Sequence, residues 1–190
     1  MRHMRLAMAC LLAVGVFSYA DDEKSPKNLV VNGSFEDGPE VPAVPGFASL
    51  DKDSDAIKGW KVTRGQIDLI EGYWKGAEGK RSLDLNGSPG TGGVKQTITT
   101  EKGKKYKLTF KLAGNPGAPA KKEVTVEAGE SKKAFAFDAT GKTQEEMGWE
   151  LKELEFTATG DKTDIELYST TADTENSGPA IDDVKVVEVK

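Results

Sequence analysis

Aromatic rings beside amides and carboxylates are the side chains with which proteins recognise sugars, and one segment of this chain combines them. Tyr73 and Trp74 stand between Gly72 and Gly76, and flanking glycines are typical of a connection between strands. A pyranose stacks its C–H faces on aromatic rings and bonds polar groups through its hydroxyls. We predict an exposed ligand-binding site at Tyr73 and Trp74, although large aromatics also serve packing. The polar contacts are expected from Asp68, Arg81, Asn86 and Asn115.

The other two tryptophans stand in a different context. Trp60 and Trp149 each follow a glycine directly, at the start of a segment with strand character. A tryptophan in that position usually packs in the core. We therefore predict that Trp60 and Trp149 are core residues that do not contact a ligand.

The first twenty residues have the pattern of a secretory signal peptide. Arg2 and Arg5 give a positively charged start, and residues 6–17 form an apolar stretch. Ser18 and Ala20 then place small residues at the two positions that a signal peptidase recognises. This order is typical of an export signal with its cleavage site. We predict a signal peptide over residues 1–20 and a secreted, extracellular protein.

Two alternatives to a cleaved signal are weaker. A membrane anchor would need about 20 apolar residues to span a bilayer, and this stretch is shorter. A lipid anchor would need its cysteine after the apolar stretch, whereas Cys10 lies inside it. Residues 21–27 are charged and contain a proline, so we expect a short flexible lead-in there.

Cleavage removes much of the chemistry available to the chain. His3 is the only histidine and Cys10 the only cysteine. Without them there is no base for a serine triad, no thiol nucleophile and no zinc ligand of either type. Glycoside hydrolysis on two carboxylates remains possible, but none of the 31 acidic residues is singled out by its context. We predict a protein that is not an enzyme, with a glycan-cleaving enzyme as the least favoured alternative.

The charge of the chain argues against two further classes of partner. It holds 31 acidic and 26 basic residues, and only Arg64 and Arg81 are arginines after the signal peptide. Nucleic-acid binding needs a basic face, and an anionic membrane needs clustered lysines, whereas the lysines here are scattered. We expect neither nucleic acid as a partner nor a membrane span after signal cleavage.

Period-two alternation marks most of the chain as strands. Tyr106, Leu108, Phe110 and Leu112 alternate with polar residues, the pattern of a strand buried on one face. Shorter runs of the same kind surround Leu83, Val94, Val124, Leu154 and Ile165, with glycine-rich turns between them. No segment has a long helical stripe. The sequence predicts one all-β domain over residues 28–190, a jelly-roll sandwich of about eight to ten strands.

Two of these strands change phase. Trp149 and Leu151 share one phase, whereas Leu154 and Phe156 take the other. The apolar pattern shifts in the same way after Val186. A one-residue change of phase predicts a β-bulge in each strand.

Eight short motifs follow one another along the chain. They are Asn28-Leu-Val-Val-Asn-Gly-Ser-Phe-Glu36, Ile57-Lys-Gly-Trp60, Gln66-Ile-Asp-Leu-Ile70 with Tyr73-Trp74, Gly79-Lys-Arg-Ser-Leu-Asp-Leu-Asn-Gly87, Gln96-Thr-Ile98, Leu112-Ala-Gly-Asn-Pro116, Met147-Gly-Trp149 and Gly178-Pro-Ala-Ile-Asp-Asp-Val184. In this order and spacing they closely resemble the bacterial choice-of-anchor C family, which is similar to the plant cell-wall family of unknown function number 642 (DUF642). The resemblance covers residues 28–189.

The resemblance implies a galactose-binding-like jelly roll on an exported protein of the cell surface or cell wall. Members usually carry a sorting signal after the domain. Here the chain stops at Lys190 with neither an apolar tail nor a sorting motif, so we expect a released protein, or one held only by what it binds.

A structural calcium ion is the cofactor that best suits the residue types present, because Ca²⁺ takes carboxylate and carbonyl oxygens. Carbohydrate-binding modules of similar fold often hold one where the first and last strands meet. By that resemblance, the ligands would be Glu36, after the expected first strand, with Asp182 or Asp183 at the start of the last. The alternative is that Glu36 caps a turn and the aspartates are solvated.

These observations favour one function and leave others open. The leading hypothesis is a secreted, non-catalytic module that binds cell-wall or extracellular polysaccharide. The second is a protein-interaction or adhesion module that meets another protein of the cell envelope. An exposed aromatic residue with nearby amides serves either function.

Overall fold

The computed structural model describes residues 26–87, 90–171 and 176–189. The predicted signal peptide and most of the predicted lead-in lie outside this range. The described part holds eleven strands and no helix. They are β1 (Phe47–Asp51), β2 (Lys61–Arg64), β3 (Gln66–Glu71), β4 (Arg81–Asp84), β5 (Gly93–Thr99), β6 (Lys105–Gly114), β7 (Lys121–Ala128), β8 (Ser131–Asp138), β9 (Glu150–Thr157), β10 (Lys162–Ser169) and β11 (Pro179–Glu188).

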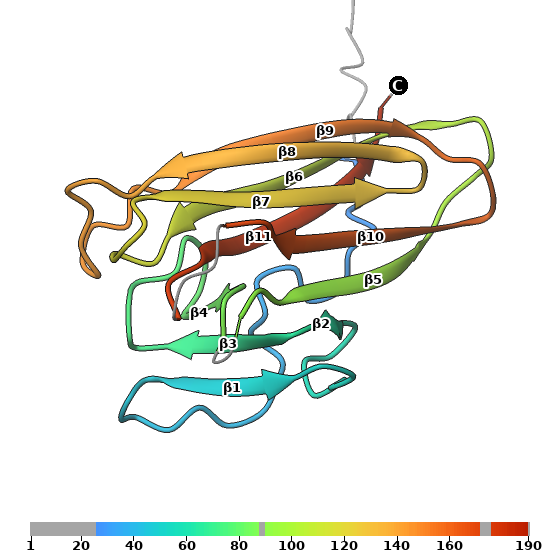
Figure 1. Ribbon diagram of the computed structural model, residues 1–190. Helices are drawn as coiled ribbons and strands as arrows, with labels where there is room; N and C mark the ends of the chain where they lie inside the picture. Colours follow the sequence, from blue (N-terminus) through green and yellow to red (C-terminus); the bar gives the residue numbers. More distant parts are fainter. Residues whose placement is uncertain (1–25, 88–89, 172–175, 190) are drawn as a thin grey trace, which may run out of the picture.

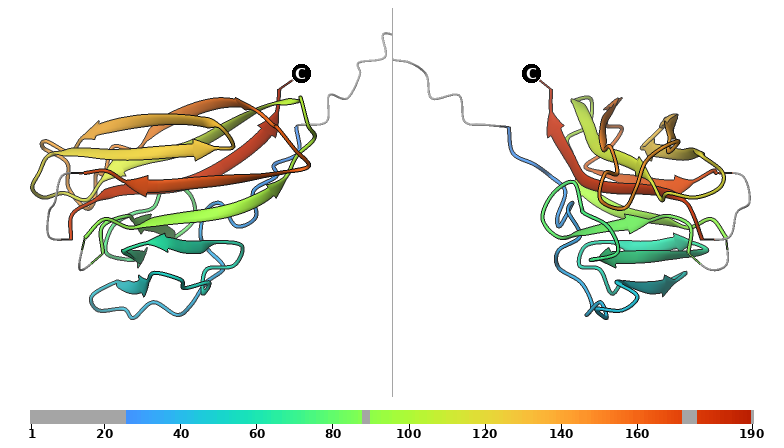
Figure 2. Two further views of the ribbon diagram at one scale, coloured as in Figure 1. Left: turned by 45° about the vertical axis from the view of Figure 1, so that its right-hand side comes forward. Right: turned by 90° about the vertical axis from the view of Figure 1, so that its left-hand side faces the viewer.

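The strands form two antiparallel sheets that pack face to face, as Figures 1 and 2 show. One sheet has the order β1-β3-β4-β11-β6-β9 and the other the order β2-β5-β10-β7-β8. The all-β sandwich is as predicted. It has one strand more than the expected range, because β1 and β2 are short and alternate poorly between buried and exposed positions.

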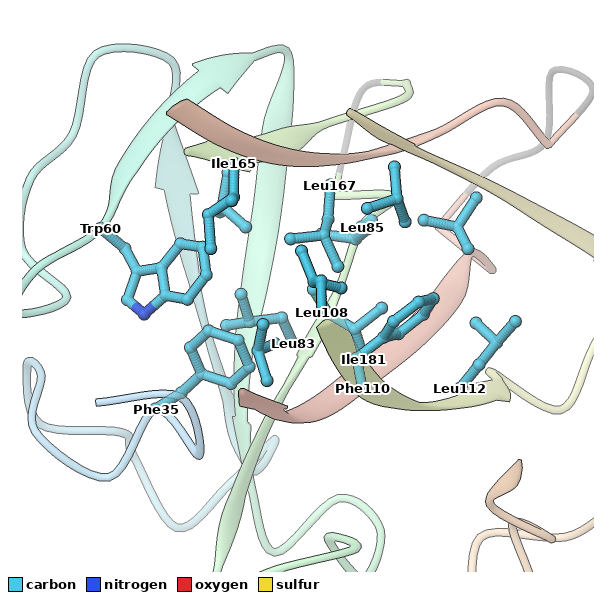
Figure 3. Close-up of a cluster of buried hydrophobic side chains, with 14 of the residues drawn as sticks. Phe35, Trp60, Leu83, Leu85, Leu108, Phe110, Leu112, Ile165, Leu167 and Ile181 are labelled. Carbon is cyan, nitrogen blue, oxygen red and sulfur yellow. The ribbon is translucent and has the colours of Figure 1, made fainter. Parts of the chain in front are cut away.

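The core lies between the sheets and follows the alternation of the sequence. On β6, every second residue from Tyr106 to Leu112 is buried, and the lysines between them face outward. Figure 3 shows Leu108, Phe110 and Leu112 of β6 in one cluster with labelled side chains of β4, β10 and β11. Trp60 is 3% exposed, and its ring lies 5.4 Å from that of Phe35. The prediction of a core position is confirmed for Trp60.

The segment expected to form the first strand, residues 28–36, is not a strand. It runs beside the last strand, where Leu29 N donates to Val186 O at 2.9 Å. A second backbone bond joins them further along, where Val184 N donates to Gly33 O at 2.9 Å. Side chains make the other bonds of the segment: Asn28 Oδ1 accepts from Val186 N, and Gln96 bonds both backbone groups of Val31. Because these bonds tie the segment to two strands at different points, it cannot continue as a regular edge strand.

The two predicted bulges have different outcomes. In β11 the register with β6 shifts between Asp182 and Lys185, so the irregularity exists but lies before the expected position. In β9 the register with β6 is continuous from Glu150 to Thr157, and the predicted bulge is wrong. Leu151 is simply an outward-facing residue, 53% exposed.

Four connections gather at one end of the sandwich, on the left of Figure 1. They follow β3 (residues 72–80), β6 (115–120), β8 (139–149) and β10 (170–178, described in part). The C-terminal end of β11 lies at the opposite end of the molecule, beside residues 26–29. The gathered connections therefore form a separate surface, far from both ends of the described chain.

Candidate functional site

Three adjoining hollows lie at the end formed by these connections. The first hollow, about 480 Å³, is lined by Tyr73, Asn115, Pro116, Gly117, Ala118, Asn176 and Ser177. The second, about 510 Å³, is lined by Gly72, Tyr73, Trp74, Lys75, Gln144 and Glu145. The third, about 300 Å³, is lined by Lys75, Gly76, Ala77, Lys111, Glu145, Glu146, Met147, Gly148 and Trp149. Shared lining residues make the three hollows neighbours in a row.

Tyr73 lines both the first and the second hollow. It is partly exposed, and it is held by an edge-to-face contact with Phe47 at 5.7 Å and a tilted contact with Trp74 at 5.5 Å. These contacts orient the ring without covering it. The Tyr73 ring is therefore accessible to a ligand, as predicted.

Trp74 does not offer such a ring, and this corrects the expectation of an exposed pair. Its side chain is 4% exposed, and its indole N–H donates to Ser82 Oγ at 2.8 Å. In the bend that follows β3, the Tyr73 ring is partly exposed, whereas the neighbouring Trp74 ring is buried in the core. Trp74 supports the site from beneath.

Trp149 is the aromatic residue that sequence reasoning missed. It is partly exposed, lines the third hollow and donates its indole N–H to Lys75 O at 3.1 Å. The prediction of a core position was wrong for Trp149. The signal was present, because Trp149 shares its phase with Leu151 and Glu153, which face outward on β9.

Two carboxylates hold the segment 76–81 that lines the third hollow and leads into β4. Asp182 Oδ2 accepts from Ala77 N at 2.7 Å and Glu78 N at 2.9 Å. Glu36 Oε1 accepts from Lys80 N and Arg81 N, both at 2.8 Å. Asp182 is fully buried, and burial raises its pKa to about 7 despite these bonds.

The predicted calcium ligands therefore lie around one segment but are already engaged. Glu36 and Asp182 accept backbone N–H groups, and the Asp183 carboxylate lies 2.6 Å from Lys185 Nζ. In the described part of the chain, no group of three or more His, Cys, Asp or Glu side chains is placed to hold a metal ion. As placed here, these residues do not present a ligand set for calcium, and the ion stays a prediction.

A buried polar network forms the wall behind the first hollow. Lys122 is fully buried, and its ammonium group donates to Gly117 O, Ser177 O and Ser177 Oγ at 3.2, 2.8 and 2.8 Å. Asn115 donates its amide to Asp84 Oδ2 at 2.8 Å and to Asn176 O at 3.0 Å. The amide of Asn115 thus stabilises the wall through these two hydrogen bonds, whereas the residue was expected to contact a ligand.

The remaining predicted contacts lie outside the three hollows. Asp68 is buried and accepts from Ser49 Oγ at 2.6 Å, and its burial raises its pKa. Asn86 is fully buried. Arg81 donates its Nε to Glu71 Oε2 at 2.7 Å. Only Tyr73, Trp74 and Asn115 of the six predicted ligand-binding residues line the hollows.

Other surfaces of the described protein are less suited to stacking. A hollow of about 410 Å³ at the opposite end and one of about 460 Å³ beside β5 contain Tyr106 and Trp60 as their aromatics, and both are buried. On the outer face of the five-stranded sheet, the guanidinium of Arg64 covers the ring of Tyr168 at 3.5 Å. Glu166 holds that guanidinium at 2.9 Å, so this ring is closed to a ligand.

Comparison with protein families confirms the resemblance to the DUF642 family. A family model described as "Protein of unknown function (DUF642)" matches residues 28–187. Halomucin of Haloquadratum walsbyi is 32% identical over 181 residues, which cover 94% of this chain and 2% of halomucin. Protein DUF642 L-galactono-1,4-lactone-responsive gene 2 of Arabidopsis thaliana is 28% identical over 183 residues, covering 86% of this chain and 47% of the plant protein. The chain spans about half the length of that plant relative and a small part of halomucin.

Solved structures confirm the galactose-binding-like jelly roll. TmCBM61, solved in complex with β-1,4-galactotriose, matches with a TM-score of 0.53 and 14% identity, over 86% of this chain and 99% of that one. CBM35 from Cellvibrio japonicus Abf62 matches with a TM-score of 0.51 and 20% identity, over 74% of this chain and 92% of that one.

The part of the chain that the structure describes contains no helix that could span a membrane.

Proposed function

The chain belongs to the DUF642 family, and from that premise we propose that it is an exported, non-catalytic module that binds cell-wall or extracellular polysaccharide. The observation that carries the proposal is the placement of Tyr73 and Trp149. Both rings are partly exposed, each is oriented by a fixed contact, and each lines a hollow that also contains amide, carboxylate or ammonium groups. This is the combination that sugar recognition requires.

The structural neighbours support this function. The solved structure of TmCBM61 contains a bound galactotriose, and several other matches are also carbohydrate-binding modules. The fold alone does not carry function. The proposal therefore depends on the two aromatic residues, with the neighbours as support.

The two carboxylates whose pKa is shifted to about 7 are not placed as catalytic acids. Asp84 and Asp182 have a pKa of about 7, the range in which a general acid works best near neutral pH. A general acid must lie within hydrogen-bond reach of its substrate, and these two are 1% and 0% exposed. Burial explains the shifted pKa of both residues without catalysis.

A polysaccharide pull-down with residues 21–190 tests the proposal. We expect the protein to bind at least one insoluble or gel-immobilised polysaccharide, and Tyr73→Ala and Trp149→Ala each to lower the bound fraction about tenfold. Leu151→Ala is the matched control, because Leu151 is exposed on the strand that follows Trp149 and lines none of the hollows. Failure of the folded protein to bind any polysaccharide would contradict the proposal and favour a protein partner.

A structural calcium ion is a separate proposal. It is supported by the contacts that Glu36 and Asp182 both make with residues 77–81 and by the preference of Ca²⁺ for carboxylate oxygens. A ligand that binds only the folded state raises its melting temperature. We expect calcium to raise the melting temperature relative to chelator, and Asp182→Asn to abolish that rise. Equal melting temperatures in calcium and chelator would refute the ion.

A further inference from the structure

The three hollows follow one another along the segment 72–77. Tyr73 lines the first and second hollows, whereas Lys75 and Glu145 line the second and third. Each volume, about 300 to 510 Å³, falls within the range of a single small-ligand site, roughly 300–1,000 Å³. A single sugar unit would therefore leave most of this surface unused.

The two aromatic rings lie at different places in the row. Tyr73 stands between the first two hollows, and Trp149 lines the third. Between them the segment is fixed by Lys75 N, which donates to Gln144 O, and by Lys75 O, which accepts from Trp149. Two rings held at separate points suit two separate sugar rings of one chain.

The charges in the row are balanced. The second hollow is lined by Lys75 and Glu145, and the third also by Lys111 and Glu146. The other polar groups of the row are amides, a serine and the two aromatic side chains. A polymer with a carboxylate on every unit would need an excess of lysine or arginine to compensate. An uncharged polymer requires no such excess.

From these observations we infer that the hollows are successive subsites for an uncharged polysaccharide chain, bound along its side over at least three sugar units. The inference rests on the proposed function, because it concerns the same site. It adds the class of ligand, a neutral internal stretch of chain, as opposed to a chain end or a free monosaccharide.

Isothermal titration with three series of oligosaccharides tests the inference. The probes are β-1,4-galactan, β-1,4-glucan and α-1,4-galacturonan oligomers of one to six units. We expect a neutral series to bind, with affinity rising more than tenfold between one and three units and reaching a plateau with longer oligomers. The galacturonan series is expected to bind more weakly than the best neutral series.

Variants of Trp149 supply a readout that a merely structural role would not give. In Trp149→Ala the plateau should move to shorter oligomers, because one subsite is lost while the others remain. Trp149→Phe keeps a ring and loses the N–H donor, so it should recover most of the affinity. Leu151→Ala should leave both the affinity and the plateau unchanged.

The outcomes separate this inference from the proposed function. A neutral monosaccharide that binds as tightly as its hexamer, tighter binding of galacturonan, or binding to polysaccharide without any binding to oligomers would overturn the inference and leave the proposed function standing. Absence of binding to every oligomer and every polysaccharide would overturn both.

Discussion

At the scale of single residues, Asp84 in the wall of the first hollow has a protonation state that depends on pH near neutrality. It is fully buried and accepts from Asn86 N, Gly178 N and Asn115 Nδ2. These bonds favour the carboxylate, but burial outweighs them and raises its pKa from 3.8 to about 7. In the folded protein, this carboxyl group therefore keeps its proton over a range in which the unfolded chain has lost it.

This difference predicts how stability changes with pH. A group whose pKa is raised on folding contributes stability that is fully present below the unfolded pKa and is lost as the pH rises through the folded pKa. The contribution of Asp84 to the free energy of unfolding should thus fall from about pH 4 to above pH 7. Urea unfolding at several pH values measures it. Asp84→Asn should make the dependence less steep, and Asp182, whose pKa burial also raises to about 7, should account for part of what remains. An identical dependence in the variant would contradict the assignment.

The two tryptophans of the site should respond differently to removal. Trp74→Ala empties a buried position and breaks the bond to Ser82, so we expect a loss of about 3–5 kcal/mol in the free energy of unfolding. Trp149→Ala should cost less than about 2 kcal/mol, because its ring is partly exposed. Denaturant titration of both variants measures the difference. A larger loss at Trp149 would place that ring in the core after all.

At the scale of elements, the wall of the first hollow depends on Lys122 of β7. Lys122→Met leaves three acceptors on residues 117 and 177 without their donor, which should cost about 1–3 kcal/mol. Hydrogen exchange should become faster at residues 115–118 and 176–178. Lys121→Met is the matched control, because Lys121 is exposed beside it and pairs only with Glu123 among the described residues. Equal exchange in both variants would show that Lys122 does not hold the wall.

The segment after β3 gives a second prediction at this scale. Asp182→Ala removes the acceptor of Ala77 N and Glu78 N, so the segment should lose protection from hydrogen exchange and ligand affinity should fall. Asp182→Asn keeps one carbonyl oxygen that can accept from Ala77 N and Glu78 N, although its amide group no longer accepts from Asp183 N. In the absence of calcium, this variant should therefore keep most of the protection that Asp182→Ala loses. If the alanine variant exchanged at the original rate, this carboxylate would not be what holds the segment.

At the scale of the whole molecule, the sandwich was predictable because alternation of apolar residues reports directly on burial. Strand β6 alternates without interruption from Lys105 to Leu112, and it lies inside its sheet, between β11 and β9. The expected first strand, before Glu36, was misjudged because side-chain bonds from Asn28 and Gln96, which no pattern reveals, leave only two backbone bonds to β11, at Leu29 and Gly33.

The candidate site was predictable only in part. Tyr73 and Trp74 are adjacent, and the fold directs one outward and the other inward, which the flanking glycines do not specify. Trp149 reaches the same surface from a segment 75 residues later in the chain, through a bond to a backbone carbonyl. Whether two residues so far apart in the sequence lie at one surface depends on the topology of the two sheets. Short sequence motifs do not specify that topology.

Both ends of the described chain lie together at the end of the sandwich opposite the three hollows, where Pro26 and Glu188 line the same separate hollow. A tether at either end would therefore project the hollows away from whatever carries the domain. Domains with adjacent ends can be inserted into larger chains with little disturbance. The same geometry makes the protein suitable for end-on immobilisation, since a sensor surface or a fused reporter would leave the ligand side open.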